Sequence, residues 1–371
     1  MKRNFHFLIL FPCFLFFKCN NEANKSEFTE IKVDIDQNIS LSLSEITEEI
    51  TVIQPELSKE SVINPEKIKR IIFFEDLVIV AEQKIVIFTK EGKFLRNIGS
   101  KGQGPGEYLN IRNIAFDEIN KQIFVNNSPK IICYDLNGNF IRESSSLFQH
   151  GGVLCDMNYI DNELLIIVDH IGRKDSKGLF NRSVLYKINN DLHIVDSCII
   201  RDTYFERPGS YSHPYKDFIL NGNSKVFLYY SDNYFAHLQM PAETVLRDTL
   251  YRLEKNCLVP ELKLKFKNDG IDGGGNKFIE LFNLYRSSRY VFAVYGNTQN
   301  NNNYRFCYDS KTGKGYNMQD GYTDDINKIE KRVSIRPSIL NTEYFYYWQT
   351  NMKPDDREEP NPTLYIGRLK N

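Results

Sequence analysis

Five basic residues are spaced so that they could meet at one place in a repeated β fold and bind an anion. Arg70, Arg112 and Arg336 stand near the starts of three predicted strands, and Lys216 and Arg286 stand nearby in two other repeat units. If such strands line a central axis, alternate side chains converge at its mouth. Guanidinium groups donate paired hydrogen bonds to carboxylate, sulfate and phosphate groups. The spacing therefore predicts a site for an anionic ligand at the channel mouth.

A simpler interpretation of the same residues stays open. Each of them could pair with a nearby acid, such as Asp117 or Asp217, and stabilise the fold instead of binding a ligand. Tyr211 and His213 join the candidate ligand-binding residues because they lie in a long predicted connection. An aromatic ring in such a connection could stack on the face of a sugar.

Signatures of catalysis and of cofactors are missing from the sequence. The five histidines that follow the first twenty residues include no HExxH pair, and neither a GxSxG nor a CxxC motif occurs. The GQGPGE stretch at 102–107 has no GK[ST] and no following helix, so it predicts a tight turn and not a phosphate loop. No metal and no cofactor is expected. Enzymatic activity stays open, because scattered carboxylates could still pair in the fold.

An internal repeat organises the elements that would position these residues. Six segments share a short strand with an aromatic residue near its end, and the five that continue past it add a polar turn and a second strand. The separations between the aromatic residues, 46, 52, 65, 57 and 57 residues, lie near the period of four-stranded propeller blades. Two further β-rich runs precede each hairpin, and long helical periodicity is absent. The aligned aromatic residues are Phe88, Tyr134, Tyr186, Tyr251, Tyr308 and Tyr365.

The last repeat unit ends after its third strand, while a spare β-prone segment, Glu49–Gln54, precedes the first unit. Pairing of the two would complete the last blade and close the ring. The expected fold is therefore all-β: a six-bladed β-propeller over residues 41–371, with four-stranded antiparallel blades closed by the strand at 49–54. The alternative is a free N-terminal arm.

The N-terminus has the features of an export signal. Lys2 and Arg3 precede an apolar stretch of 13 residues, Phe5–Phe17, which is too short to span a membrane. We expect residues 1–18 to be a signal peptide, Cys19 to be lipidated, and residues 19–40 to form a polar tether. Lys18 departs from the small residue that usually precedes a lipidated cysteine.

The segment Ile98–Glu143, IGSKGQGPGEYLNIRNIAFDEINKQIFVNNSPKIICYDLNGNFIRE, resembles an NHL-type propeller repeat. Together with the export signal and Ser42–Glu56, SLSEITEEITVIQPE, the chain resembles the six-bladed β-propeller lipoproteins of Bacteroidota. That resemblance implies a propeller fold and a location in the cell envelope. It implies no particular activity and no catalytic residues.

These patterns together predict an exported, envelope-anchored binding or scaffold module. Its ligand would be a glycan fragment, a peptide or a partner envelope protein. A net charge of −1 gives no basic field for nucleic acid. We expect a monomer held at the membrane by its lipid anchor, in the outer membrane and facing the periplasm or the cell surface. The alternative function is that of a saccharide hydrolase or lyase with its site at one end of the axis.

Overall fold

The protein is represented by a computed structural model in which nearly all regular structure is β. Helical segments are limited to α1 (Leu43–Ile46) and two short 3-10 turns, η1 (Pro65–Lys67) and η2 (Lys267–Gly270). The structure describes residues 28–144, 147, 152–205, 211–212, 218–222, 224–231, 234–235, 240–241, 246–255, 257–350 and 359–371.

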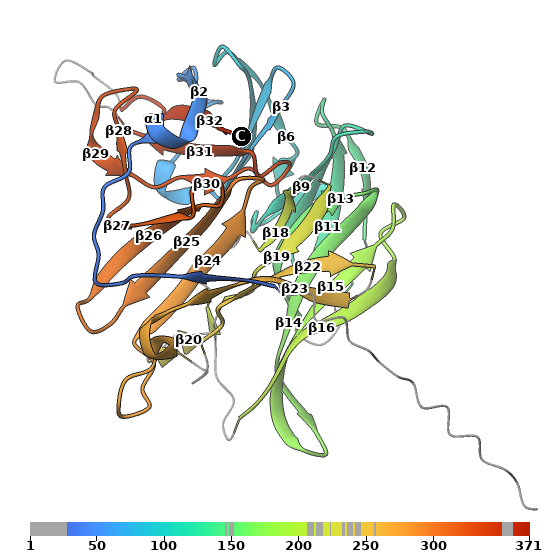
Figure 1. Ribbon diagram of the computed structural model, residues 1–371. Coiled ribbons are helices and arrows are strands. Elements are labelled where there is room, and N and C mark those ends of the chain that lie inside the picture. Colours follow the sequence, from blue (N-terminus) through green and yellow to red (C-terminus); the bar gives the residue numbers. More distant parts are fainter. Residues whose placement is uncertain are drawn as a thin grey trace, which may run out of the picture.

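Within these residues, six sheets contain four or more strands and follow one another along the chain (Figure 1). The first sheet consists of β3 (Arg70–Phe74), β4 (Leu77–Ala81), β5 (Ile85–Thr89) and β6 (Phe94–Ile98). The second consists of β9 (Ile114–Asp117), β10 (Gln122–Asn127), β11 (Lys130–Asp135) and β12 (Phe140–Glu143). The third consists of β13 (Gly152–Ile160), β14 (Glu163–Asp175), β15 (Gly178–Ile188) and β16 (Ile194–Phe205).

The other three sheets complete the sequence of repeats. The fourth contains β18 (Ile219–Gly222), β19 (Lys225–Leu228), β22 (Thr249–Glu254), β23 (Cys257–Lys265) and, at its outer edge, β1 (Thr29–Lys32). The fifth contains β24 (Ile279–Arg286), β25 (Tyr290–Asn297), β26 (Asn302–Asp309) and β27 (Lys314–Gln319). The sixth contains β30 (Arg336–Pro337), β31 (Tyr344–Gln349), β32 (Thr363–Leu369) and β2 (Thr47–Ile53).

Smaller elements decorate the connections between the sheets. These are the parallel pair β7 (Ser100–Lys101) and β8 (Glu107–Tyr108), the hairpin of β28 (Tyr322–Asp324) and β29 (Ile329–Val333), and a three-stranded group of β17 (Tyr211–Ser212), β20 (Tyr234–Phe235) and β21 (Met240–Pro241). The sequence pattern did not predict them, because each strand of the first and third groups is only two residues long.

The two middle strands of the first sheet are buried on both faces. β4 reads LVIVA and β5 reads IVIFT, and almost every one of their residues is buried. The outer strand β6 is only half-buried. A strand covered on both faces is continuously apolar and does not alternate, because a neighbouring sheet packs on each side. The aligned aromatic residues of the repeat all lie on the third strand of a sheet, for example Phe88 on β5 and Tyr365 on β32.

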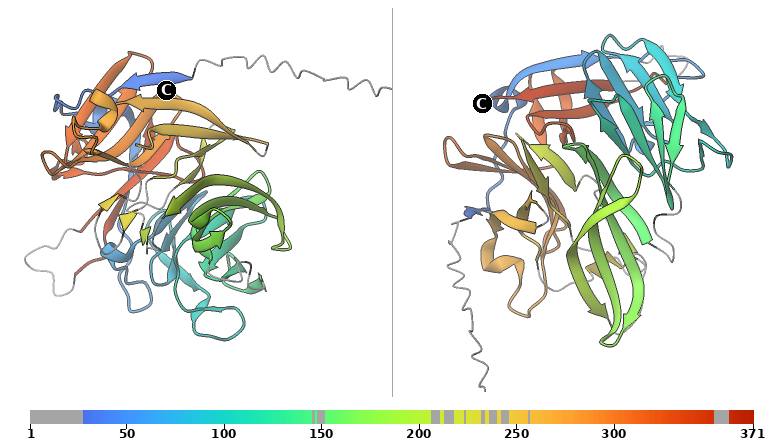
Figure 2. Two further views of the ribbon diagram at one scale, coloured as in Figure 1. Left: turned by 90° about the horizontal axis from the view of Figure 1, so that it is seen from below. Right: turned by 90° about the vertical axis from the view of Figure 1, so that its right-hand side faces the viewer.

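Each sheet shares buried apolar side chains with the sheets before and after it. One cluster joins the second and third sheets, another the third and fourth, and a third the fourth and fifth. The largest cluster joins the first to the second and the fifth to the sixth. The sixth and first sheets also share a cluster, in which the rings of Phe73 and Tyr346 lie 5.7 Å apart. Red strands of the sixth sheet accordingly lie beside blue strands of the first (Figure 2).

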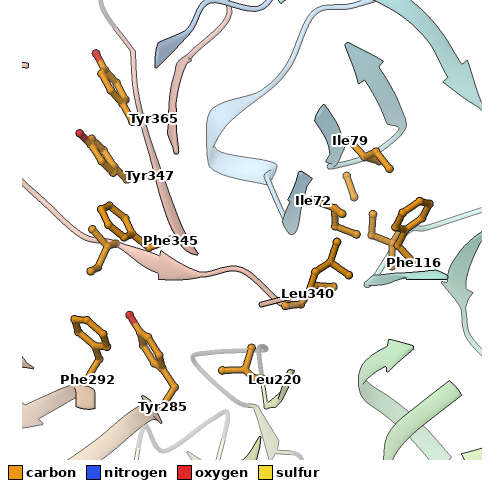
Figure 3. Packing of buried hydrophobic residues seen from close by; sticks show 14 of the residues in the cluster. Ile72, Ile79, Phe116, Leu220, Tyr285, Phe292, Leu340, Phe345, Tyr347 and Tyr365 are labelled. Atoms are coloured by element: carbon orange, nitrogen blue, oxygen red, sulfur yellow. The ribbon is translucent and has the colours of Figure 1, made fainter. Parts of the chain in front are cut away.

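Apolar side chains fill the region where the innermost strands converge. Leu340, in the connection after β30, lies between Ile72 of the first sheet and Leu220 of the fourth (Figure 3). Ile72 is fully buried, and Leu220 and Leu340 are nearly so. This part of the predicted axis is packed with side chains.

Two N-terminal segments extend sheets that lie far away in sequence. β2 pairs antiparallel with β32, with Ile53 opposite Leu364 and Glu49 opposite Arg368, which is the pairing that the sequence predicts for residues 49–54. Residues 29–32, which were expected in the polar tether, form β1 and pair in parallel with β23. Ile31 and Val33 are buried there, so the folded part begins earlier than residue 41.

The packing of β2 can be tested with two substitutions on one strand. Ile53 is 1% exposed between the sixth and first sheets, whereas Val52 is 51% exposed. Ile53→Ala should lower the free energy of unfolding by about 2–5 kcal/mol, because it leaves a cavity. Val52→Ala makes a similar change in β propensity and should cost no more than about 0.5 kcal/mol. Denaturant unfolding measures both, and equal losses would mean that β2 is not packed against the first sheet.

Candidate functional site

Arg70 lies inside the fold and not at the mouth of a channel. Its side chain is fully buried, and its Nη2 lies 2.8 Å from Oδ1 of Asp156, whose side chain is also fully buried. Its Nη1 donates to the carbonyl oxygens of Ile114 and Met157 at 2.6 and 2.7 Å. Arg70 therefore joins the innermost strands of the first three sheets and presents no surface to a ligand from solvent.

Asp156 accepts hydrogen bonds from residues in or beside the innermost strands of four sheets. A β-bulge at Cys155 on β13 changes the register between Leu154 and Asp156, and such bulges redirect side chains. A buried carboxylate needs several donors to offset its lost hydration. Its donors are Arg70, Asn113 Nδ2, and the backbone N–H groups of Met157 (2.8 Å), Phe218 (2.7 Å) and Ile219 (3.0 Å).

Asn158, two residues further along β13, extends this polar centre to the sixth sheet. Its Nδ2 donates to the carbonyl oxygens of Ile219 and Ile339 at 3.0 and 2.9 Å. Its Oδ1 accepts the N–H of Tyr159. Asp156 and Asn158 together link five of the six sheets, so the arginine predicted to bind a ligand belongs to the structural centre.

Arg286 is also engaged in an ion pair. It ends β24, and its Nη1 lies 2.9 Å from Oε1 of Glu261 on β23. The guanidinium also lies over the Phe227 ring, 6.0 Å from its centroid. Glu261 is shared with Arg252 at 2.7 Å. This geometry corresponds to the alternative that the sequence left open, in which the cation stabilises the packing of neighbouring sheets.

Arg112 is exposed and lines a cavity of about 310 Å³ beside the GQGPGE stretch. A hydrogen bond within the stretch holds its turn: the N–H of Gly104 donates to the Glu107 carboxylate at 2.8 Å. The same carboxylate would repel a phosphate. Lys130, which also lines the cavity, is paired with Glu143 at 2.7 Å. The GQGPGE stretch is a turn, as the sequence predicts, and Arg112 lies beside it. The other cation of this cavity, Lys130, is already paired with Glu143.

Arg336 lines a different cavity, of about 280 Å³, between the fifth and sixth sheets. Its guanidinium lies 4.6 Å from the centroid of the Trp348 ring. Arg305 of β26 lines the same cavity and donates from Nε to Ser334 Oγ at 3.2 Å. Among the described residues, neither arginine has an ion-pair partner. Two cations from neighbouring sheets therefore meet in one small pocket.

The other polar groups of this pocket leave its cationic character intact. Asn283 is buried, and its Oδ1 accepts the N–H of Leu284 at 2.9 Å. The Tyr347 hydroxyl donates to Asp324 at 2.5 Å. Burial raises the pKa of Tyr347, and the hydrogen bond to Asp324 raises it further, so this hydroxyl stays protonated. The carboxylate of Asp324 is occupied by Tyr347 and Asn327 and is not paired with either arginine.

Arg305 was missed by the sequence reasoning, which searched only the starts of innermost strands. It lies on a third strand and meets Arg336 across the gap between two sheets. One signal in the sequence could have found it. Arg305 interrupts the apolar and aromatic run YRFCY, and charged residues are rare in buried strands.

Three predicted site residues, Lys216, His213 and Cys19, lie outside the described residues, as does the predicted signal peptide 1–18. Tyr211 belongs to β17, which pairs with β20. Within the described part of the chain, no helix is long and apolar enough to cross a membrane, and no cluster of three or more His, Cys, Asp or Glu residues could hold a metal ion.

A family model described as a domain of unknown function, DUF4934, matches residues 27–365. None of the curated proteins matches the sequence.

Among solved structures, the chain is similar to a candidate exported protein of Bacteroides fragilis NCTC 9343, with 18% identity over 92% of this chain and 99% of that chain and a TM-score of 0.62. This likeness concerns the fold alone. A DUF4221 family member from Bacteroides vulgatus (13% identity, 87% and 97% coverage, TM-score 0.46) and an oligogalacturonate lyase from Vibrio parahaemolyticus (11% identity, 86% and 82% coverage, TM-score 0.42) are too distant to support an argument.

The structural role of Arg70 predicts a large loss of stability when it is changed. Arg70→Met should lower the free energy of unfolding by about 3–5 kcal/mol, because it leaves Asp156 as a buried charge without its cation. The matched control is Arg182→Met, which breaks an ion pair to Asp202 of similar length, 2.7 Å, whose side chains are 30% and 31% exposed. That change should cost less than about 1 kcal/mol. Urea unfolding compares the two, and a similar loss in both would contradict the role of Arg70.

Proposed function

The chain belongs to the DUF4934 family, and we propose that it is an exported binding module that holds its ligand through an anionic group. One observation carries the proposal: Arg305 and Arg336 line one pocket, and neither has an ion-pair partner among the described residues. A cation without a counter-ion in a partly enclosed pocket attracts a negative group more strongly than one in open water.

We propose that the six sheets are the blades of a closed six-bladed propeller, with β2 completing the last blade. The pairing of β2 with β32 supports this, and so does the apolar cluster shared by the first and sixth sheets. A rigid ring of this kind holds pockets between blades at fixed geometry.

We further propose that the protein is exported and anchored in the envelope through lipidated Cys19, in the outer membrane facing either the periplasm or the cell surface. Support comes from the basic and apolar N-terminal stretch. The similar Bacteroides fragilis protein is named as a candidate exported protein, which agrees with this location.

The chemistry of the pocket favours a glycan fragment that carries a carboxylate or sulfate group. Two guanidinium groups suit the paired oxygens of such a group. The rings of Trp348 and Tyr285 line the same pocket, and aromatic side chains are common contacts for sugars. A volume of about 280 Å³ suits one charged unit of a larger chain. An acidic peptide or an acidic segment of an envelope protein would present the same carboxylate. A saccharide hydrolase or lyase is not better supported than a binding role.

The pocket predicts charge-dependent binding that two substitutions remove. In the mature protein, Arg305→Ala and Arg336→Ala should each weaken binding of a uronate-containing or sulfated oligosaccharide by about 10-fold or more, because each removes a charge-assisted hydrogen bond. Raising the salt concentration should also weaken binding. A glycan array followed by titration calorimetry identifies the ligand and measures its affinity.

Two control variants locate the effect. Arg173→Ala removes an arginine from β14, outside both arginine-lined pockets, and should leave affinity unchanged. Arg112→Ala tests the cavity beside the GQGPGE stretch. Unchanged affinity in both Arg305→Ala and Arg336→Ala would show that this pocket is not the binding site. Cleavage of the bound glycan would show that the protein is an enzyme and not only a binding module.

A further inference from the structure

A third and larger cavity lies where the chain passes into and out of the first sheet. Its volume is about 840 Å³, which is in the range of small-molecule sites. Its wall is formed by residues 62–66 before β3, the turn 82–84 between β4 and β5, Asn97 near the end of β6, residues 99–101 after β6, Tyr108 of β8, and residues 359–360 before β32. It is separate from the arginine pocket and shares no lining residue with it.

Glu82 is a buried acid in the wall of this cavity. It is 5% exposed, and within the part of the chain that the structure describes its carboxylate has neither a hydrogen-bond donor nor an ion-pair partner. Its backbone N–H donates to the carbonyl oxygen of Lys84 at 2.9 Å, which fixes the turn. The Glu82 carboxylate therefore receives no hydrogen bond from the described protein, and its acceptor capacity is left for whatever occupies the cavity. A ligand that donates hydrogen bonds would use that capacity.

Lys84 lies near Glu82 but is held away from it. Its Nζ donates to the backbone carbonyl oxygen of Glu60 at 2.6 Å, and no ion pair with Glu82 forms. Burial lowers the pKa of Lys84, although the charges of Glu82 and Glu60 act in the opposite direction. The cavity wall therefore presents an acceptor-only group and a donor-only group that interact electrostatically without touching.

Hydroxyl groups fit this arrangement better than charged groups do. A hydroxyl both donates and accepts, so two adjacent hydroxyls can donate to the carboxylate and accept from the ammonium at the same time. A cationic ligand would meet Lys84 and Lys101, and an anionic ligand would meet Glu66, Glu82 and Glu359. The apolar side chains of Ile63, Pro65 and Pro360 offer contact for the C–H groups of a ring.

We propose that this cavity binds a neutral saccharide unit, whose adjacent hydroxyl groups donate to Glu82 and accept from Lys84. The site goes beyond the anionic-ligand function assigned to the arginine pocket, and each site can fail without the other.

Neutral trisaccharides of glucose, xylose and mannose, titrated into the mature protein, are the probes. We expect saturable binding of at least one of them. Glu82→Gln should weaken that binding by about 10-fold or more, because a charge-assisted hydrogen bond is lost. The same change should leave the melting temperature equal or higher, because the Glu82 carboxylate has no hydrogen-bond donor or ion-pair partner among the described residues that the change could break. Lys84→Met should also weaken binding.

Two further variants serve as controls. Glu66→Gln changes an exposed acid in the same wall and should have little effect, and Arg305→Ala with Arg336→Ala should leave neutral-sugar binding intact. The proposal is overturned if none of the trisaccharides binds, if Glu82→Gln binds them as the unaltered protein does, or if a glucosamine oligomer binds in their place. Loss of anionic-glycan binding alone would reject only the function of the arginine pocket.

Discussion

The fold depends on one buried carboxylate. Asp156 accepts hydrogen bonds from the innermost strands of four sheets, and Arg70 supplies the charge that makes its burial tolerable. Sheets that meet at a centre leave polar backbone groups there, and these need partners once water is excluded. An acid that accepts from at least five residues meets that need and fixes the relative positions of the strands. The same interaction lies where the innermost strands of these sheets converge.

Because the centre is occupied, the chemistry available to ligands lies elsewhere. The arginine pocket lies between the fifth and sixth sheets, and the Glu82 cavity lies where the chain passes into and out of the first sheet. The two differ in character: the first combines two arginines that have no ion-pair partner among the described residues, and the second contains an acid, Glu82, and a base, Lys84, that do not pair with each other. An oligosaccharide with both charged and neutral units could place a charged unit in the arginine pocket and a neutral unit in the Glu82 cavity. Under the proposed function, the packed sheets would form the walls of both sites, and the residues between the sheets would determine which ligand binds.

Sequence reasoning predicted the local and repeated features well. The aligned aromatic residues, such as Tyr134 and Tyr308, all fall on third strands, and β2 pairs with β32 in the sheet where it was expected. It failed where the outcome depends on contacts between distant parts of the chain. Arg70 meets Asp156 across 86 residues and through a bulge at Cys155, which no local pattern announces. Residues 29–32 fell within the expected tether, 19–40, which follows the predicted lipidated cysteine, and it is pairing with β23 that makes them a strand.

The central claim is that the innermost strands are held together at Asp156. Amide hydrogen exchange, followed by NMR, tests it directly at Phe218 and Ile219, whose N–H groups donate to the Asp156 carboxylate. Their exchange should be among the slowest in the protein and should require global unfolding. Exchange of these two amides as fast as that of an amide in an exposed turn, such as that of Thr312, would contradict the account.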